Sequence, residues 1–142
     1  MVMVRNPAKE RLAAGQLAIG VAVLHARSVH IAKLMAAAGF DFLFIDLEHG
    51  AMSLDTAGQI SVAALDAGIA PMVRVPGFEH HHAARALDAG ALGVAIPHVD
   101  TAEVARQMVR NCRYPPEGAR SIAGAPPQLG YRALPSRRRP RR

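Results

Sequence analysis

Cysteine and long apolar runs are scarce in this chain of 142 residues, and each scarcity excludes a class of protein. The single cysteine, Cys112, excludes an internal disulfide framework and indicates a cytoplasmic location. The longest apolar stretches, such as residues 17–24, fall well short of the roughly 20 residues that a membrane span needs. The N-terminus has no apolar run that resembles a secretory signal. With 51% hydrophobic and 20% charged residues, the composition instead predicts a globular protein without a membrane partner.

Acidic residues are outnumbered, 11 against 17 lysines and arginines, but the basic excess is confined to one end. Five of the last six residues are arginines, and without them the net charge falls from +6 to +1. Because the body has no basic face of the kind that follows a phosphate backbone, we do not expect nucleic acid as a partner. We predict a domain over residues 1–135 and a basic, disordered tail over residues 136–142. A tail that anchors the chain to nucleic acid is the alternative, and it predicts salt-dependent binding.

Apolar runs alternate along the chain with segments of helical spacing. Strands are predicted at residues 17–24, 42–45, 69–75 and 91–96. Helices are predicted at residues 6–15, 28–39, 53–66, 79–88 and 100–111, with Asn6, Ser28 and Asp100 as expected N-caps. Three joints place a glycine at a helix exit directly before an apolar strand, where a left-handed residue is common. Residues 124–135, which include three prolines, are predicted as a loop.

Nearly continuous apolar strands separated by amphipathic helices indicate an α/β protein, with a parallel sheet covered by helices. Two architectures fit this pattern: an open doubly wound sheet, or part of a (β/α)8 barrel. No glycine-rich nucleotide motif follows the first predicted strand, which weakens the nucleotide-binding interpretation. A complete barrel typically takes about 250 residues, so this chain holds only half of one.

Charged and imidazole side chains follow three of the predicted strands at the points where the strands end. Asp46, Glu48 and His49 follow the second strand, Arg74 lies at the end of the third, and His98 follows the fourth. Because parallel strands finish at the same end of a sheet, we expect these side chains to lie close together. A histidine oriented by a carboxylate can act as a general base, and an arginine can bind a carboxylate or a developing oxyanion. The pattern is typical of proton transfer next to a carbonyl group, or of aldol cleavage of a keto acid.

A structural role is the alternative for each of these residues. Asp46 and Glu48 would then cap or pair locally, with Arg74 balancing their charge, and His98 would contribute only loop polarity. The histidines at residues 80–82 resemble a metal-binding tract, but consecutive helical side chains point about 100° apart and do not converge on one ion. Spacing alone leaves catalytic and structural roles open.

Five ordered blocks of the sequence resemble a single family. They are GFDFLFIDLEHG at residues 39–50, PMVRVP at 71–76, LDAGA at 87–91, VAIPHV at 94–99 and RYPPEGAR at 113–120. Across residues 15–134 the chain resembles the HpcH/HpaI aldolases, which are class II, metal-dependent enzymes that cleave 4-hydroxy-2-oxo acids to pyruvate and an aldehyde. The resemblance implies the N-terminal half of a TIM-type (β/α)8 barrel and a small-molecule 2-oxo acid substrate. It also implies a homo-oligomer that acts in the catabolism of aromatic or sugar acids.

The resemblance implies roles for four individual residues. His49 corresponds to the catalytic base that takes the proton of the C4 hydroxyl group, and Asp46 corresponds to its orienting partner. Arg74 corresponds to the arginine that binds the pyruvate end of the substrate and stabilises the enolate-like transition state. Asp88 corresponds to an aspartate that raises the basicity of the histidine, often across a subunit boundary.

The metal site of the family is where this sequence departs from the pattern. The family binds Mg²⁺ or Mn²⁺ through a glutamate and an aspartate on later strands, which correspond to positions beyond residue 142. Because hard divalent cations need several oxygen ligands, we expect no metal site in this chain. The abrupt change to arginine-proline sequence after Leu134 favours truncation by a frameshift or a mis-called stop codon. Two hypotheses remain open: an aldolase, or a non-catalytic half-barrel that pairs with itself or with a full-length homologue.

Overall fold

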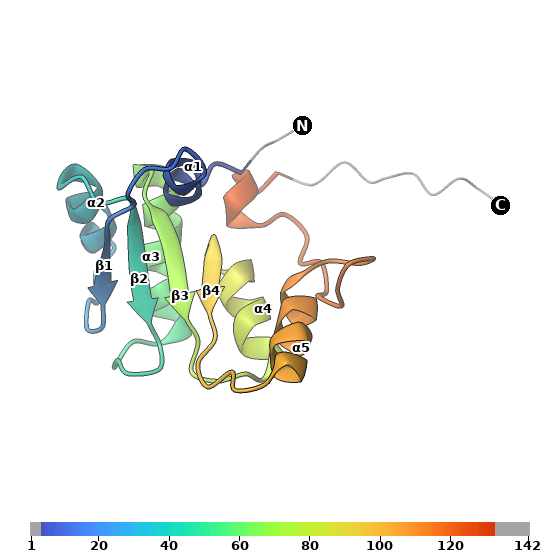
Figure 1. Ribbon diagram of the computed structural model, residues 1–142. Helices are drawn as coiled ribbons and strands as arrows, with labels where there is room; N and C mark the ends of the chain where they lie inside the picture. Colours follow the sequence, from blue (N-terminus) through green and yellow to red (C-terminus); the bar gives the residue numbers. More distant parts are fainter. Residues whose placement is uncertain (1–3, 133–142) are drawn as a thin grey trace.

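A computed structural model describes residues 4–132, which form one parallel sheet with helices packed against it. The strands are β1 (Gly20–Val23), β2 (Phe42–Asp46), β3 (Ala70–Arg74) and β4 (Gly93–Ala95) (Figure 1). Each of the four predicted strands is present. The two outer strands, β1 and β4, are shorter than predicted, and within residues 4–132 each pairs on one side only, over four and three residues respectively.

The order of the strands decides between the two architectures. All four strands are parallel, and they lie side by side in the order β1-β2-β3-β4. A doubly wound sheet reverses its strand order at a switch point, whereas a barrel adds each strand next to the one before it. The described chain therefore has the topology of consecutive barrel units.

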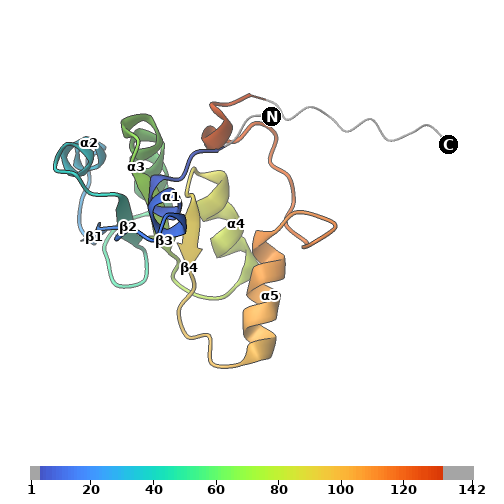
Figure 2. The same ribbon diagram turned by 45° about the horizontal axis from the view of Figure 1, so that its top comes forward.

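The helices cover one face of this sheet. Within residues 4–132 they are α1 (Pro7–Ala13), α2 (His30–Ala37), α3 (Leu54–Ala67), α4 (His80–Asp88), α5 (Ala102–Cys112) and a short 3-10 helix, η1 (Pro127–Leu129). Helices α2, α3 and α4 lie along the same face of the sheet, and α1 lies at the end where the strands begin (Figures 1 and 2). Figure 2 shows no other described helix over the opposite face, which is the interior face of a barrel.

Several helix ends follow signals in the sequence. The Asn6 side chain accepts a hydrogen bond of 3.0 Å from the backbone N–H of Lys9 at the start of α1. Ser53 accepts one of 3.1 Å from the N–H of Thr56 at the start of α3. Gly68 ends α3 with φ of 75°, in the left-handed region that a glycine adopts without strain. These ends confirm the predicted limits of α1 and α3.

Two predicted N-caps were wrong by one residue. The N-cap of α2 is Val29, whose side chain makes no capping bond, while the Ser28 hydroxyl accepts a 3.3 Å bond from the N–H of His30, the first residue of the helix. The N-cap of α5 is Thr101 rather than Asp100. Thr101 has extended backbone angles, and its hydroxyl accepts a 3.2 Å bond from the N–H three residues further on. The α5 cap exchanges one hydrogen-bonding side chain for its neighbour, whereas α2 begins without a side-chain cap.

The core lies between the sheet and the helices. Alternate residues of the central strands, such as Leu43, Ile45 and Val73, are fully buried against α3, which contributes Ile60 and Ala64. The intervening residues of the same strands point to the other face and are only half-buried; they include Phe42, Phe44 and Met72. The strands are therefore apolar on both faces, although described helices cover only one of them.

Two expectations about the chain ends fall partly outside the structure. The predicted loop at residues 124–135 contains η1, and its last three residues are not among those described, nor is the predicted tail at residues 136–142. A domain boundary at residue 135 thus remains a prediction.

Across residues 4–132, none of the helices combines the length and the apolarity that crossing a bilayer requires.

Candidate active site at the carboxyl end of the sheet

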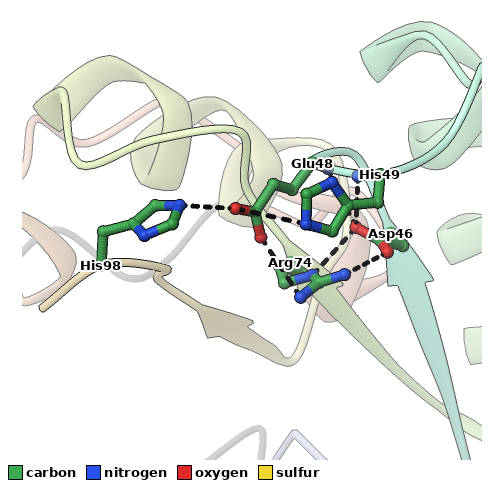
Figure 3. A network of polar contacts seen from close by, with 5 residues as sticks. All are labelled: Asp46, Glu48, His49, Arg74 and His98. Carbon is green, nitrogen blue, oxygen red and sulfur yellow. Dashed lines mark hydrogen bonds and ion pairs between the residues drawn. The ribbon is translucent and has the colours of Figure 1, made fainter.

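Charged side chains converge where the strands finish, at what we call the carboxyl end of the sheet (Figure 3). Asp46 is the last residue of β2, and the strand register places it beside Arg74, the last residue of β3. Both follow the alternation that directs Phe44 and Met72 away from the helices, so they share the interior face. The loop after β2 adds Glu48 and His49. The structure therefore brings together three of the four predicted site residues, which are Asp46, His49 and Arg74.

Asp46 and Arg74 form a two-pronged ion pair. Arg74 Nε donates a hydrogen bond of 2.9 Å to Asp46 Oδ1, and Arg74 Nη2 donates a second bond to Oδ2. The Asp46 side chain is 3% exposed and that of Arg74 is 28% exposed. The guanidinium also lies over the Phe44 ring, with 5.7 Å between Cζ and the ring centroid. This geometry holds the arginine in one orientation, because two parallel bonds fix both direction and plane.

The ion pair shifts the titration of both partners. Hydrogen bonding from Arg74 lowers the pKa of Asp46 from 3.8 to about 2; burial opposes this shift, and the backbone N–H groups of His49 and Glu48 support it. The hydrogen bond to Asp46 likewise raises the pKa of Arg74 above its ordinary value. Both groups are therefore charged across the range in which a histidine base operates.

Glu48 connects the ion pair to two histidines. Its Oε2 lies 3.2 Å from Arg74 Nη1, and its Oε1 lies 2.8 Å from His98 Nε2 and 3.8 Å from His49 Nε2. The Glu48 side chain is 9% exposed, so its charge needs these partners. Sequence reasoning placed Glu48 in the cluster and gave it only a structural alternative, local capping or pairing, with no catalytic role. The signal was its spacing, because residues 46 and 48 of an extended segment point to the same side.

His49 is held through its backbone. Its N–H donates a 3.1 Å bond to Asp46 Oδ1, which also accepts a 2.9 Å bond from the N–H of Glu48. The imidazole ring is 69% exposed and faces Glu48 (Figure 3). Asp46, predicted to orient His49, therefore contacts its backbone and Arg74 in this structure, while the nearest carboxylate to the ring belongs to Glu48.

A glycine permits the tight course of this loop. A Cβ atom added at Gly50 would lie 2.5 Å from the backbone oxygen of Leu24 and 2.7 Å from that of Asp46. Both distances are far below van der Waals contact, and both obstacles are backbone atoms that cannot rotate away. Gly50 thus lets the loop that carries His49 pack directly against the end of β1.

His98 reaches the cluster from β4. Its ring is 72% exposed, and Nε2 contacts Glu48, a residue 50 positions earlier in the chain. Its backbone has φ of 55°, a left-handed conformation that is uncommon outside glycine and that often marks functional loops. From the sequence, His98 was either part of the predicted cluster or only a polar loop residue. No local pattern indicates a partner as distant in the chain as Glu48.

Asp88, the fourth predicted site residue, is not part of this cluster. It is the last residue of α4, and a helix in a parallel β/α unit runs back towards the end where the strands begin. There Arg120 Nη2 donates a 2.5 Å bond to Asp88 Oδ1, and the same guanidinium lies 4.7 Å from the Tyr114 ring centroid. Within one chain Asp88 and His49 are thus on opposite ends of the sheet, and a role across a subunit boundary stays a prediction.

Other candidate ligands do not gather. Among residues 4–132, no group of three or more histidine, cysteine, aspartate or glutamate side chains is placed to hold a metal ion. The oxygens of Asp46 and Glu48 are already engaged by the donors described above. In the tract at residues 80–82, His82 Nε2 lies 3.3 Å from a carboxylate oxygen of Glu79. Burial raises the pKa of the Cys112 thiol, which disfavours a reactive thiolate.

Comparison with known proteins agrees with this geometry. The model of the HpcH/HpaI aldolase/citrate lyase family matches residues 21–131, which include the whole cluster and almost all of the described elements. The chain belongs to this family. The family resemblance predicted from the sequence blocks is thereby confirmed.

Several curated proteins that this chain resembles are named as aldolases. A 4-hydroxy-4-methyl-2-oxoglutarate aldolase from Chaetomium globosum is 42% identical over 89% of this chain and 48% of its own length. Another 4-hydroxy-4-methyl-2-oxoglutarate aldolase, from Hapsidospora irregularis, is 40% identical over 95% of this chain and 50% of its own length. A hydroxypyruvate/pyruvate aldolase from Roseobacter denitrificans is 37% identical over 84% and 46%. The chain spans about half the length of the curated relatives it matches.

Solved structures of the family share the fold. An HpcH/HpaI aldolase from Desulfitobacterium hafniense superposes with a TM-score of 0.83 at 32% identity, covering 89% of this chain and 49% of that one. Macrophomate synthase superposes with a TM-score of 0.68 at 34% identity, covering 82% and 40%. These neighbours have TIM-type folds, of which the described chain matches about half. The predicted class, parallel β/α units from one half of a TIM-type barrel, is confirmed.

Proposed function

We propose that this HpcH/HpaI family chain supports aldol cleavage of a 4-hydroxy-2-oxo acid into pyruvate and a second carbonyl compound. The observation that carries the proposal is Arg74, fixed by Asp46 and Glu48 beside His49 at the carboxyl end of the sheet. Two relatives are named for 4-hydroxy-4-methyl-2-oxoglutarate, and this compound is our first candidate substrate. Because the chain spans about half of each relative, the complete activity is part of the proposal.

Arg74 is suited to the negatively charged end of such a substrate. It shares its charge with two carboxylates, and its side chain is 28% exposed on the interior face. We assign it the carboxylate of the 2-oxo acid and the negative charge that grows on the oxo oxygen as the enolate forms. A fixed donor placed before reaction stabilises such charge without reorganisation.

His49 is suited to the proton transfer. In the proposed step its ring takes the proton of the C4 hydroxyl group, the C4–O bond becomes a carbonyl, and the C3–C4 bond breaks. The bonding electrons pass to C3 and delocalise as the enolate of pyruvate, which a proton at C3 converts to pyruvate. The exposed ring is accessible to substrate, and the bond from its backbone to Asp46 fixes the base of the side chain.

A divalent cation, Mg²⁺ or Mn²⁺, is the cofactor that the family resemblance implies. The residues of the described chain do not fit such a site, since no cluster of potential ligands forms among them. We therefore assign no step to a cation here. We also propose, from the family resemblance, that the protein is cytoplasmic and assembles into a homo-oligomer.

The test is pyruvate release from 4-hydroxy-4-methyl-2-oxoglutarate with Mg²⁺ or Mn²⁺ in the assay, followed through a coupled reduction of pyruvate. We expect the His49→Ala variant to lose activity by about 100-fold or more, the ordinary contribution of a general base. His81→Ala, which removes an exposed histidine of α4, is the matched control and should retain activity. A folded wild-type protein with no pyruvate release above His49→Ala would contradict the proposal.

A non-catalytic half-barrel is the second candidate, and the uncovered sheet face favours it. Phe42, Phe44 and Met72 are half-buried on a face that carries no described helix apart from α1 at one end. The outer strands β1 and β4 each pair on one side only within residues 4–132. An apolar face between two open strand edges is a surface for association with a second copy or with a full-length homologue.

A further inference from the structure

We propose that His98, tethered by Glu48, is a substrate-recognising residue that selects 4-hydroxy-2-oxo acids carrying a second carboxylate. This inference rests on the proposed aldolase function and extends it to a residue that determines specificity. The observation behind it is the reach of the His98 ring to a buried carboxylate that also contacts Arg74 and His49.

Three nitrogen groups surround the single Glu48 carboxylate. Arg74 lies against Oε2, while His98 and His49 lie against Oε1, at 2.8 Å and 3.8 Å (Figure 3). They come from three neighbouring strand ends, those of β3, β4 and β2. Glu48 thereby sets the spacing between Arg74, which binds the oxo-acid end, the base His49, and the further imidazole of His98.

The charge balance explains why the further imidazole matters. Asp46 and Glu48 bring two negative charges to the cluster, and Arg74 brings one fixed positive charge. A substrate with two carboxylates adds two more negative charges. His49 must accept a proton from the substrate, so it has to enter the reaction uncharged. Among the residues of the cluster, His98 alone is left to supply a donor for the second carboxylate.

The geometry of His98 suits this task. Nε2 is directed at Glu48, and the other ring nitrogen, Nδ1, is bonded to the same carbon, Cε1, but forms its hydrogen bonds in a direction that diverges from that of Nε2. When Nδ1 carries a proton, it can donate to an anion while Nε2–H remains bonded to Glu48. With 72% of the side chain exposed, that anion can approach from solvent. The backbone of His98 is left-handed, with φ of 55°, and its ring reaches the cluster from one side, at Glu48 (Figure 3).

The experiment compares two uncleavable probes of equal chain length by isothermal titration calorimetry. 2-Oxoglutarate has a second carboxylate, and 2-oxopentanoate has a methyl group in its place. We expect the wild-type chain to bind 2-oxoglutarate about tenfold more tightly, the ratio that one charge-assisted hydrogen bond supplies. His98→Ala should abolish this ratio and leave the affinity for 2-oxopentanoate unchanged. His98→Lys, which restores a cation beside Glu48, should retain part of the ratio.

Two controls make the outcomes distinct. His25→Ala removes another exposed histidine, in the loop after β1, and should keep the wild-type ratio. Glu48→Gln, which removes the charge that tethers His98, should lower the ratio. A ratio that persists in His98→Ala overturns this inference and leaves the aldolase proposal standing. Failure of both probes to bind overturns the inference, and the separate pyruvate assay then decides the aldolase proposal.

Discussion

At the scale of single residues, one carboxylate organises the candidate site. Asp46 accepts four hydrogen bonds: two from the Arg74 side chain and two from the backbone N–H groups of Glu48 and His49. It therefore orients the anion-binding arginine and shapes the loop that carries the base. Such a carboxylate stabilises the fold most while it is ionised, because a charged acceptor forms stronger hydrogen bonds with these donors than a protonated one.

Replacement of Asp46 by asparagine tests this stabilisation. The pKa of Asp46 in the folded chain is about 2, below its ordinary 3.8, so the ionised form contributes stability above pH 4 and loses it as the pH falls towards 2. The shift corresponds to about 2 kcal/mol at neutral pH. We expect Asp46→Asn to lower the free energy of unfolding by about this amount at pH 7, and the difference to vanish near pH 2.

Urea unfolding followed by circular dichroism between pH 2 and pH 7 measures this difference. Asp66→Asn, at an exposed position on α3, is the matched control and should change the free energy of unfolding little at any pH. An Asp46→Asn deficit that stays constant from pH 7 to pH 2 would show that geometry, rather than charge, accounts for the role of Asp46.

At the scale of elements, the loop between β2 and α3 depends on a close backbone approach. The sequence predicted both flanking elements, because the strand is continuously apolar and Ser53 provides an N-cap. It did not predict that Gly50 passes against the backbone oxygens of Leu24 and Asp46, since that contact joins this loop to the end of β1. Glycine is required there for space rather than for an unusual φ.

A methyl group at Gly50 should therefore disturb the loop. We expect Gly50→Ala to lower the free energy of unfolding by about 1–3 kcal/mol, the range for overpacking, and to reduce any pyruvate release by displacing His49. Thermal unfolding and the pyruvate assay measure the two effects. Gly93→Ala is the control, because a Cβ there meets its nearest atom, Met72 Cγ, at an ordinary 3.5 Å. Equal stability of both variants would argue against a close approach at Gly50.

At the scale of the whole molecule, the sheet has an apolar face that no helix of residues 4–132 covers, apart from α1 at one end. The helices α2, α3 and α4 occupy one side (Figure 2), and Phe44 and Met72 lie half-buried on the other. Relatives of about twice this length contain a second half that this chain does not match. The interior face is therefore the surface that we expect to govern self-association of the chain.

We expect the chain to associate in solution through this face. Light scattering should give a mass of at least two chains, and Phe44→Ser together with Met72→Ser should shift the mass towards one chain by weakening the apolar contact. Leu34→Ser, an exposed apolar position on α2, is the control and should leave the mass unchanged. A monodisperse single chain at micromolar concentration would contradict self-association.

The sequence by itself determined the α/β class, four strands, the limits of most helices and the side chains at the carboxyl end of the sheet. Those features depend on local periodicity, capping chemistry and the rule that parallel strands finish together. Tertiary structure decided which of these side chains meet. Arg74 pairs with Asp46 across 28 positions, Glu48 contacts His98 across 50, and Asp88 pairs with Arg120 at the other end of the sheet. Such pairs depend on strand register and on side-chain torsions, which no local pattern encodes.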